Sequence, residues 1–172
     1  MDALLVRIAE RITSGADPLL SPSEALELAH LPESATLDIL SVAGLARATR
    51  RPAAAFTCGI INAKSGRCPE NCAFCAQSAH HRTDSPVYPL YDTDTLLRRA
   101  EELAANNVDR FGIVTSGTAP SDRDFDALCE SALRIGREVK IGLCASLGLL
   151  TPERAPRLRE AGFTSYHHNL ET

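Results

Sequence analysis

The sequence lacks features that mark several classes of protein. Its 172 residues contain 18 Lys and Arg against 22 Asp and Glu, a formal net charge of −4, so no excess of positive charge favours a nucleic acid as partner. No apolar run is long enough to cross a membrane, and the N-terminus carries Asp2 and Glu10 where a signal peptide is basic. We therefore expect a cytoplasmic protein that binds neither nucleic acid nor membrane.

Repeats and low-complexity tracts are also absent, and the composition, 44% hydrophobic and 23% charged, is that of a folded domain. Cysteine, by contrast, is in moderate excess, with six residues, of which Cys68, Cys72 and Cys75 fall within eight positions. A disulfide framework has more even spacing and needs an oxidising compartment. The cluster of three therefore indicates a metal site.

Residues 1–50 are predicted to form a helical lead-in whose helices pack without taking part in chemistry. Leu4, Leu5, Ile8 and Ile12 recur at helical spacing, and this first helix is expected to end near Ser14 and Gly15. Ser21 and Glu24 match a capping box with Pro22 at the first position of a second helix. A third helix is predicted from about Ser34 to Arg47.

Residues 51–172 alternate between strand and helix patterns, which indicates an α/β fold with parallel strands joined by helices. Strands are predicted at residues 56–63, 110–115, 139–145 and 163–169, and helices at residues 94–106, 121–136 and 151–162. A (β/α) barrel of eight such units typically needs about 250 residues. We interpret this region as the first half of a TIM-type barrel, about four β-α units, truncated at the C-terminus.

The spacing Cys-x3-Cys-x2-Cys lies on a loop that follows the first predicted strand, at the end of the strands where catalytic loops collect. Three thiolates can hold three corners of a 4Fe–4S cluster and leave the fourth iron open to another ligand. One alternative is a structural zinc site with His80 or His81 as the fourth ligand. A redox disulfide between Cys72 and Cys75 is another, although it gives Cys68 no role.

This loop, with an aromatic residue before its last cysteine, resembles that of the radical S-adenosylmethionine enzymes. The segment from Cys58 to His81 and the ending from Tyr166 to Thr172 resemble more specifically the biotin synthase family, and the resemblance runs from about residue 50 to the C-terminus. Radical enzymes that mature hydrogenase cofactors or build thiamine share the loop and remain an alternative. A further alternative is a non-catalytic fragment that binds a cluster or zinc.

The resemblance implies a set of roles for single residues. Cys68, Cys72 and Cys75 would ligate the 4Fe–4S cluster, whose open iron binds S-adenosylmethionine. Phe74 would lie against the adenine, Ser116 would receive the cofactor backbone, and Glu171 would bind the ribose hydroxyls. Asn169 would bind the ureido ring of the substrate, dethiobiotin, which receives sulfur to become biotin. On an extended fourth strand, His167, Asn169 and Glu171 share one face and His168 points to the other.

The resemblance also implies a sulfur donor, an auxiliary 2Fe–2S cluster held by cysteines on separate strands. Cys144 matches one ligand position, but Gly112 stands where a second ligand is expected. Cys58 and Cys129 are interpreted as core cysteines. The implied partners are dethiobiotin, a one-electron donor such as flavodoxin or ferredoxin, and a second copy of the chain in a homodimer.

Overall fold

The computed structural model describes residues 2–50 and 56–169, and the chain divides into two compact units, Met1–Ala55 and Phe56–Thr172. Each unit has its own cluster of buried hydrophobic residues. Among the described residues, no helix is both long and apolar enough to span a membrane.

The first unit consists of α1 (Ala3–Ser14), α2 (Pro22–Ala29), a short 3-10 turn (Glu33–Ala35) and α3 (Thr36–Arg50). The four apolar residues predicted from their spacing are the buried face of α1, and they pack with Val42 of α3. Gly15 ends α1 in the left-handed conformation (φ 76°), which glycine adopts without strain. The predicted capping box is confirmed, with Ser21 and Glu24 making both reciprocal hydrogen bonds.

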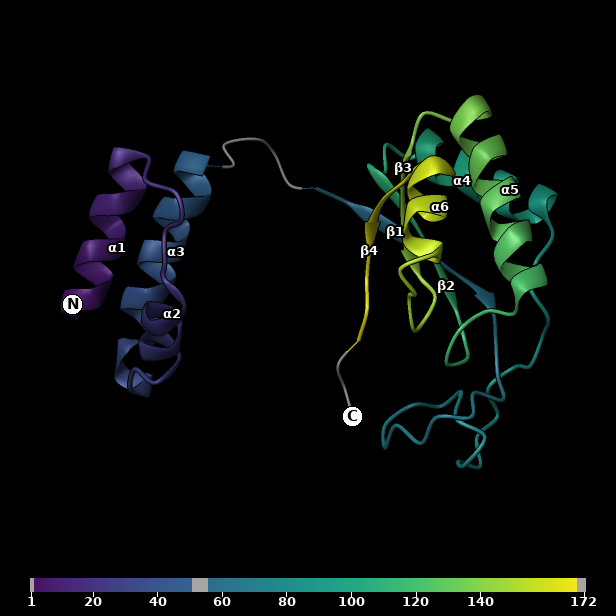
Figure 1. The fold of residues 1–172 in the computed structure, drawn as a ribbon, viewed down its shortest axis with the longest axis horizontal. Coiled ribbons are helices and arrows are strands. Elements are labelled where there is room, and N and C mark those ends of the chain that lie inside the picture. The colour runs from purple at the N-terminus through teal and green to yellow at the C-terminus, as the bar shows by residue number, and fades with distance from the viewer. Residues whose placement is uncertain (1, 51–55, 170–172) are drawn as a thin grey trace. The chain divides into compact units, whose positions relative to one another are not determined.

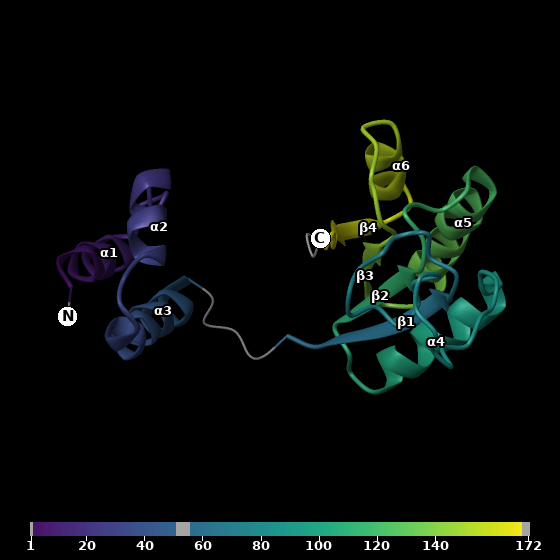
Figure 2. The same ribbon diagram turned by 90° about the horizontal axis from the view of Figure 1, so that it is seen from below.

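The second unit alternates β1 (Cys58–Lys64), α4 (Thr93–Ala105), β2 (Arg110–Thr115), α5 (Asp122–Glu138), β3 (Gly142–Ser146), α6 (Arg154–Glu160) and β4 (Phe163–Tyr166). The strands form one sheet in the order β1-β2-β3-β4, and every neighbouring pair is parallel (Figures 1 and 2). The predicted α/β fold with four parallel strands is therefore confirmed.

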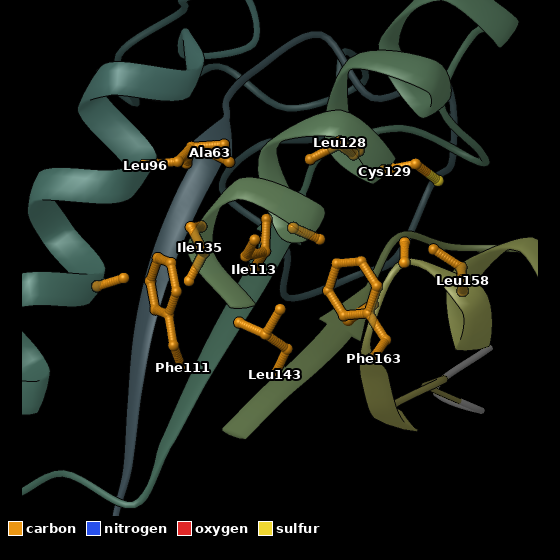
Figure 3. Packing of buried hydrophobic residues seen from close by; sticks show 14 of the residues in the cluster. Ala63, Leu96, Phe111, Ile113, Leu128, Cys129, Ile135, Leu143, Leu158 and Phe163 are labelled. Carbon is orange, nitrogen blue, oxygen red and sulfur yellow. The ribbon is translucent and has the colours of Figure 1, made fainter. Parts of the chain in front are cut away.

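The core of the second unit lies between the sheet and its helices. Alternate residues of β2 and β3, such as Phe111, Ile113 and Leu143, meet Leu96 of α4 and Leu128 of α5 (Figure 3). Because side chains alternate along a strand, the intervening residues lie on the other side of the sheet. We call that side, which carries Cys58, Ile60, Gly112 and Cys144, the open face.

Two strand boundaries differ from the prediction by three residues, and the remaining differences are of one or two residues. β3 begins at Gly142 rather than at Val139, because Val139 caps α5 and is buried in the core. β4 ends at Tyr166 rather than at Asn169. β3 itself ends at Ser146 and turns at Gly148 (φ 79°), so the last bond of the ladder runs from the amide of His167 to the carbonyl of Ala145, 2.8 Å.

Candidate functional site

The loop between β1 and α4 is folded by its own backbone hydrogen bonds. The amide of Cys68 donates to the carbonyl of Gln77 (2.9 Å), and the amide of Ala79 donates to the carbonyl of Cys68 (2.8 Å). The side-chain oxygen of Gln77 accepts from the amide of Gly66 (3.1 Å) and the hydroxyl of Ser65 (3.0 Å). Gly66 has a φ of 88°, where a side chain would be strained. The sequence therefore sets the cysteines on a preformed loop.

Two histidines brace the cysteine loop. The Nε2 atom of His80 is hydrogen-bonded to the carbonyl of Pro69 (3.0 Å), and that of His81 to the carbonyl of Cys72 (3.1 Å). One ring nitrogen of each is thus engaged with the loop backbone. This arrangement gives both rings a bracing role in the loop.

A cavity of about 430 Å³ lies at the carboxyl ends of the four strands. The three loop cysteines, all free thiols and half-buried, line it together with Glu70 and Gln77. Its other walls are residues 114–118 after β2, Ser146, Gly148 and Leu149 after β3, and His167, His168 and Asn169 after β4. The fold thus brings three thiols to the edge of the sheet where parallel α/β proteins bind their ligands.

The end of β2 supplies two neighbouring hydroxyls, those of Thr115 and Ser116. Thr115 lines the cavity, is only 8% exposed, and its Oγ1 has no hydrogen-bond partner among the described residues. A buried hydroxyl without a partner is costly, so this atom is suited to a bound ligand. The neighbouring Ser116, predicted to bind the cofactor, also lines the cavity, and its hydroxyl donates to the carbonyl of Gly66 at 3.1 Å.

Hydrogen bonds join the loops that form the cavity. The Thr118 hydroxyl donates to the Glu70 carboxylate at 2.5 Å, which links the cysteine loop to the segment after β2. The Thr118 carbonyl accepts from the amide of Leu149 at 2.7 Å, which adds the segment after β3. The Tyr166 hydroxyl donates to the carbonyl of Gly148 at 2.7 Å and so attaches the end of β4.

The residues after β4 lie differently from the prediction. His168, expected on the opposite face, lines the cavity beside His167, and its Nδ1 is 3.0 Å from the carbonyl of Gly148. That expectation was wrong because β4 ends at Tyr166, and strand alternation does not continue past it. His167 Nδ1 is 3.3 Å from the hydroxyl of Ser146, and Asn169 lines the cavity. Glu171 lies outside the described residues.

The remaining predicted residues divide between the open face, the core and the surface. Cys144 is half-buried on the open face, and Gly112 is its partner in the pairing of β2 with β3. Cys58 is exposed on the same face, so its interpretation as a core cysteine was wrong. Cys129 is buried in the core, and this burial raises the pKa of its thiol. Phe74 is 67% exposed on the cysteine loop, and its contact with an adenine stays a prediction.

Comparison with protein-family models identifies the superfamily of the chain. The model of the radical SAM superfamily matches residues 63–172, well over half of the chain, and the chain belongs to this superfamily. Membership implies a 4Fe–4S cluster and S-adenosylmethionine. Three free thiols and an unpaired buried hydroxyl around one cavity fit this pair of cofactors.

The chain is also similar to curated biotin synthases. Over 153 residues the chain is 59% identical to the biotin synthase of Nitratidesulfovibrio vulgaris (strain DP4), which covers 89% of this chain and 42% of that protein. It is 47% identical to the biotin synthase of Oleidesulfovibrio alaskensis, covering 96% of this chain and 51% of that protein. The chain spans about half the length of the curated relatives it matches.

Solved structures support the fold. The chain is similar to the hydrogenase maturase HydG with a TM-score of 0.73 at 16% identity, covering 96% of this chain and 36% of that one. It is similar to methylornithine synthase with a TM-score of 0.70, also at 16% identity, covering 94% of this chain and 46% of that one.

Proposed function

We propose that this protein catalyses the biotin synthase reaction, the insertion of sulfur into dethiobiotin. The observation that carries the proposal is the single cavity at which the three loop thiols meet the ends of β2, β3 and β4. The high identity to biotin synthases over most of the chain supports this substrate over those of other radical enzymes with the same loop.

Five residues of this chain are proposed to bind the two cofactors. Cys68, Cys72 and Cys75 hold the 4Fe–4S cluster, and Thr115 and Ser116 receive the polar backbone of S-adenosylmethionine. When bound, these cofactors supply a one-electron cleavage that yields a radical able to remove hydrogen from a saturated carbon. The enclosing loops position the cofactor and exclude competing reactions, which is the principal task of the protein in such chemistry.

The contacts to the ends of the cofactor and to the substrate complete the proposal. Phe74 packs against the adenine, Glu171 binds the ribose hydroxyls, and Asn169 donates and accepts hydrogen bonds at the ureido ring of dethiobiotin, since an amide has both functions. Cys144 would be one ligand of an auxiliary 2Fe–2S cluster, which would supply the sulfur, and a flavodoxin or ferredoxin would supply the electrons. We also propose a homodimer, as the resemblance implies.

The first experiment is anaerobic reconstitution with iron and sulfide, followed by electron paramagnetic resonance of the reduced chain. We expect a four-iron signal that changes when S-adenosylmethionine is added. Cys72→Ala should abolish it, whereas Cys129→Ala, in the core of the helical side, should not. Bound zinc without iron, or a signal indifferent to the cofactor, would contradict the proposal.

Turnover then separates this reaction from those of related radical enzymes. With a reductant, S-adenosylmethionine and dethiobiotin, the expected products are 5′-deoxyadenosine, methionine and biotin, measured by mass spectrometry. Cofactor cleavage that dethiobiotin does not accelerate, with no biotin formed, would favour another radical reaction. A cluster that cleaves no cofactor at all would leave the non-catalytic fragment as the better interpretation.

A further inference from the structure

The cysteine loop borders a second cavity besides the one that its thiols line. This outer cavity, of about 270 Å³, is lined by residues 66–67 and 76–79 and by residues of the segment 81–87. Gln77 lines both cavities, and Arg67 lines the outer one whereas the next residue, Cys68, lines the inner one. The loop is therefore thin here, and a molecule at the outer cavity is close to a cluster held by the thiols.

The segment 81–87, which forms part of the outer cavity, is fixed to the rest of the loop. Ser65 and Tyr88 exchange two backbone hydrogen bonds of 3.2 Å just beyond its end. The hydroxyl of Thr83 donates to the carbonyl of Ala76 at 2.6 Å, directly after the last loop cysteine. Figure 1 shows the loop between β1 and α4 extending beyond the ends of the strands. This outer side is thus accessible and preformed, so a partner loses little entropy in ordering it.

Two arginines give the outer side a local positive charge. Arg67 and Arg82 are exposed, and neither has a recorded ion-pair partner among the described residues. Residues 65–91 contain two acids, Glu70 and Asp84. Glu70 lines the inner cavity, where it accepts a hydrogen bond from Thr118, and Asp84 is exposed. The chain as a whole has a net charge of −4, so an acidic partner is attracted to this side of the loop although the rest of the chain repels it.

An exposed apolar side chain lies between these charges and the sheet. Val87 lines the outer cavity and is 60% exposed, with one face against Gly66, where a β-carbon would lie 2.6 Å from it. An apolar contact with charged residues around it is the usual composition of a protein–protein interface. The outer side therefore has the features of a small docking surface for another protein.

From this arrangement we infer that the outer side of the cysteine loop, with Arg67, Arg82 and Val87, is the docking surface for an acidic one-electron carrier. The inference rests on the proposed function, in which the inner cavity holds S-adenosylmethionine and substrate, so the electron must enter from another side. One electron passes from the reduced flavin or iron–sulfur centre of the carrier to the four-iron cluster. The carrier is oxidised by one electron, the cluster is reduced by one, and no covalent bond forms or breaks.

Binding of a labelled bacterial flavodoxin, an acidic protein, tests the surface without needing the cluster. By fluorescence anisotropy at low salt, we expect Arg67→Gln with Arg82→Gln to weaken binding about tenfold, and Arg82→Gln alone to weaken it by less. Asp84→Asn, which removes the acid of this side, should strengthen binding. Arg137→Gln is the control, because Arg137 is equally exposed but lies in the last turn of α5. Equal affinities in the double variant and the control would overturn the inference.

The dependence on salt tests whether the arginines act by their charge. Raising the salt from about 20 to about 300 mM should weaken flavodoxin binding to the unsubstituted chain, because salt screens exposed charges. The double variant should bind with a flatter dependence on salt, and its affinity should meet that of the unsubstituted chain at the high end. An unchanged dependence would mean that charges elsewhere attract the flavodoxin, and would contradict the assignment of this surface.

Electron transfer in the reconstituted chain distinguishes this inference from the proposed function. In stopped-flow mixing, the double variant should oxidise reduced flavodoxin about tenfold more slowly than the unsubstituted chain at low salt. Photoreduction by an uncharged deazaflavin should reduce both clusters at the same rate. Slower reduction by both reagents would mean that Arg67 alters the cluster itself, and would overturn the inference. Failure of the proposed function would instead show as a cluster in the unsubstituted chain that S-adenosylmethionine does not affect, while the binding measurement still decides the docking surface.

Discussion

Glu24 shows how one side chain joins two helices of the first unit. Its carboxylate accepts two hydrogen bonds from the guanidinium of Arg11 on α1, at 2.7 and 2.8 Å, and also completes the capping box at the start of α2. The hydrogen bonds from Arg11, followed by those from Ser21, hold the pKa of Glu24 at about 2, against its ordinary value of 4.5. The charged form of Glu24 therefore stabilises the folded state.

The pH dependence follows from this lowered pKa. Because the folded pKa lies below the unfolded one, the stabilisation is complete above pH 4.5 and is lost as the pH falls toward 2. We expect Glu24→Gln to lower the midpoint of thermal unfolding at pH 7 and to make little difference at pH 2, as measured by circular dichroism. Glu27→Gln, on the same helix, is the control, and an equal effect at both pH values would contradict the argument.

Gly148 is a second residue whose identity is fixed by geometry. Its φ is 79°, and a β-carbon there would collide with the carbonyl of Thr118 in the cavity wall. Gly148→Ala should destabilise the chain by about 1–3 kcal/mol, the usual cost of a strained backbone position. The midpoint of its urea unfolding should therefore lie below that of the unsubstituted chain. Gly136→Ala lies in helix α5 with open space around it and should stabilise by about 0.5–1 kcal/mol. Equal effects would show that the collision relaxes without cost.

At the scale of elements, α6 depends on arginines that reach α5. The guanidinium groups of Arg154 and Arg157 lie 4.7 and 5.0 Å from the ring centre of Phe125, and each forms an ion pair with an aspartate of α5. α6 has only seven residues, so its own hydrogen bonds are too few to stabilise it. Tertiary contacts of this kind must hold α6 in place.

Removing these contacts should loosen one region only. In Arg154→Ala with Arg157→Ala, we expect amide hydrogen exchange to become faster in residues 151–169 and to stay unchanged in α4, since each lost cation–π contact is worth about 0.5–1 kcal/mol. Arg99→Ala, whose recorded partner Glu102 is on its own helix, is the control. Uniformly faster exchange would indicate global destabilisation instead.

The elements best predicted from the sequence were those with local signals. Ser21 with Glu24, and Ser121 at the start of α5, are capping residues whose hydrogen bonds join near neighbours, and the starts of both helices were placed correctly. The end of β4 was not, because it depends on where β3 turns at Gly148, a residue distant in the sequence from Asn169. Local chemistry is visible in a sequence, whereas the length of a strand depends on its neighbour.

The site residues also divide into those that local sequence signals predicted and those that depend on contacts between strands. The spacing of Cys68, Cys72 and Cys75 predicted one shared metal site on the loop after the first strand, and in the structure all three thiols line one cavity. The unpaired hydroxyl of Thr115 and the exposure of Cys58 could not be predicted, because both depend on which face of the sheet the helices cover. Register across strands, not spacing along one, brings Cys58 close to Gly112.

At the scale of the whole molecule, the two units have separate hydrophobic cores, so we expect each unit to have its own free energy of unfolding. Leu5 is buried in the cluster of the first unit and Leu128 in that of the second, and the clusters share no residue. A unit of this size buries only about 60% of the surface its unfolded chain exposes, so it is marginally stable. Leu5→Ala, at a cost of about 2–5 kcal/mol, should therefore unfold much of the first unit.

The second unit should keep its function in that variant, because the cavity and the cysteine loop belong to it alone. We expect Leu5→Ala to lose helical circular dichroism while the reconstituted chain keeps its iron and its cofactor-sensitive signal. Leu128→Ala, an equal truncation beneath the sheet, should reduce iron loading as well, since the strands whose ends form the cavity rest on that core. If Leu5→Ala also abolished iron loading, the first unit would have to stabilise the second, and the separation of the two cores would not extend to their stability.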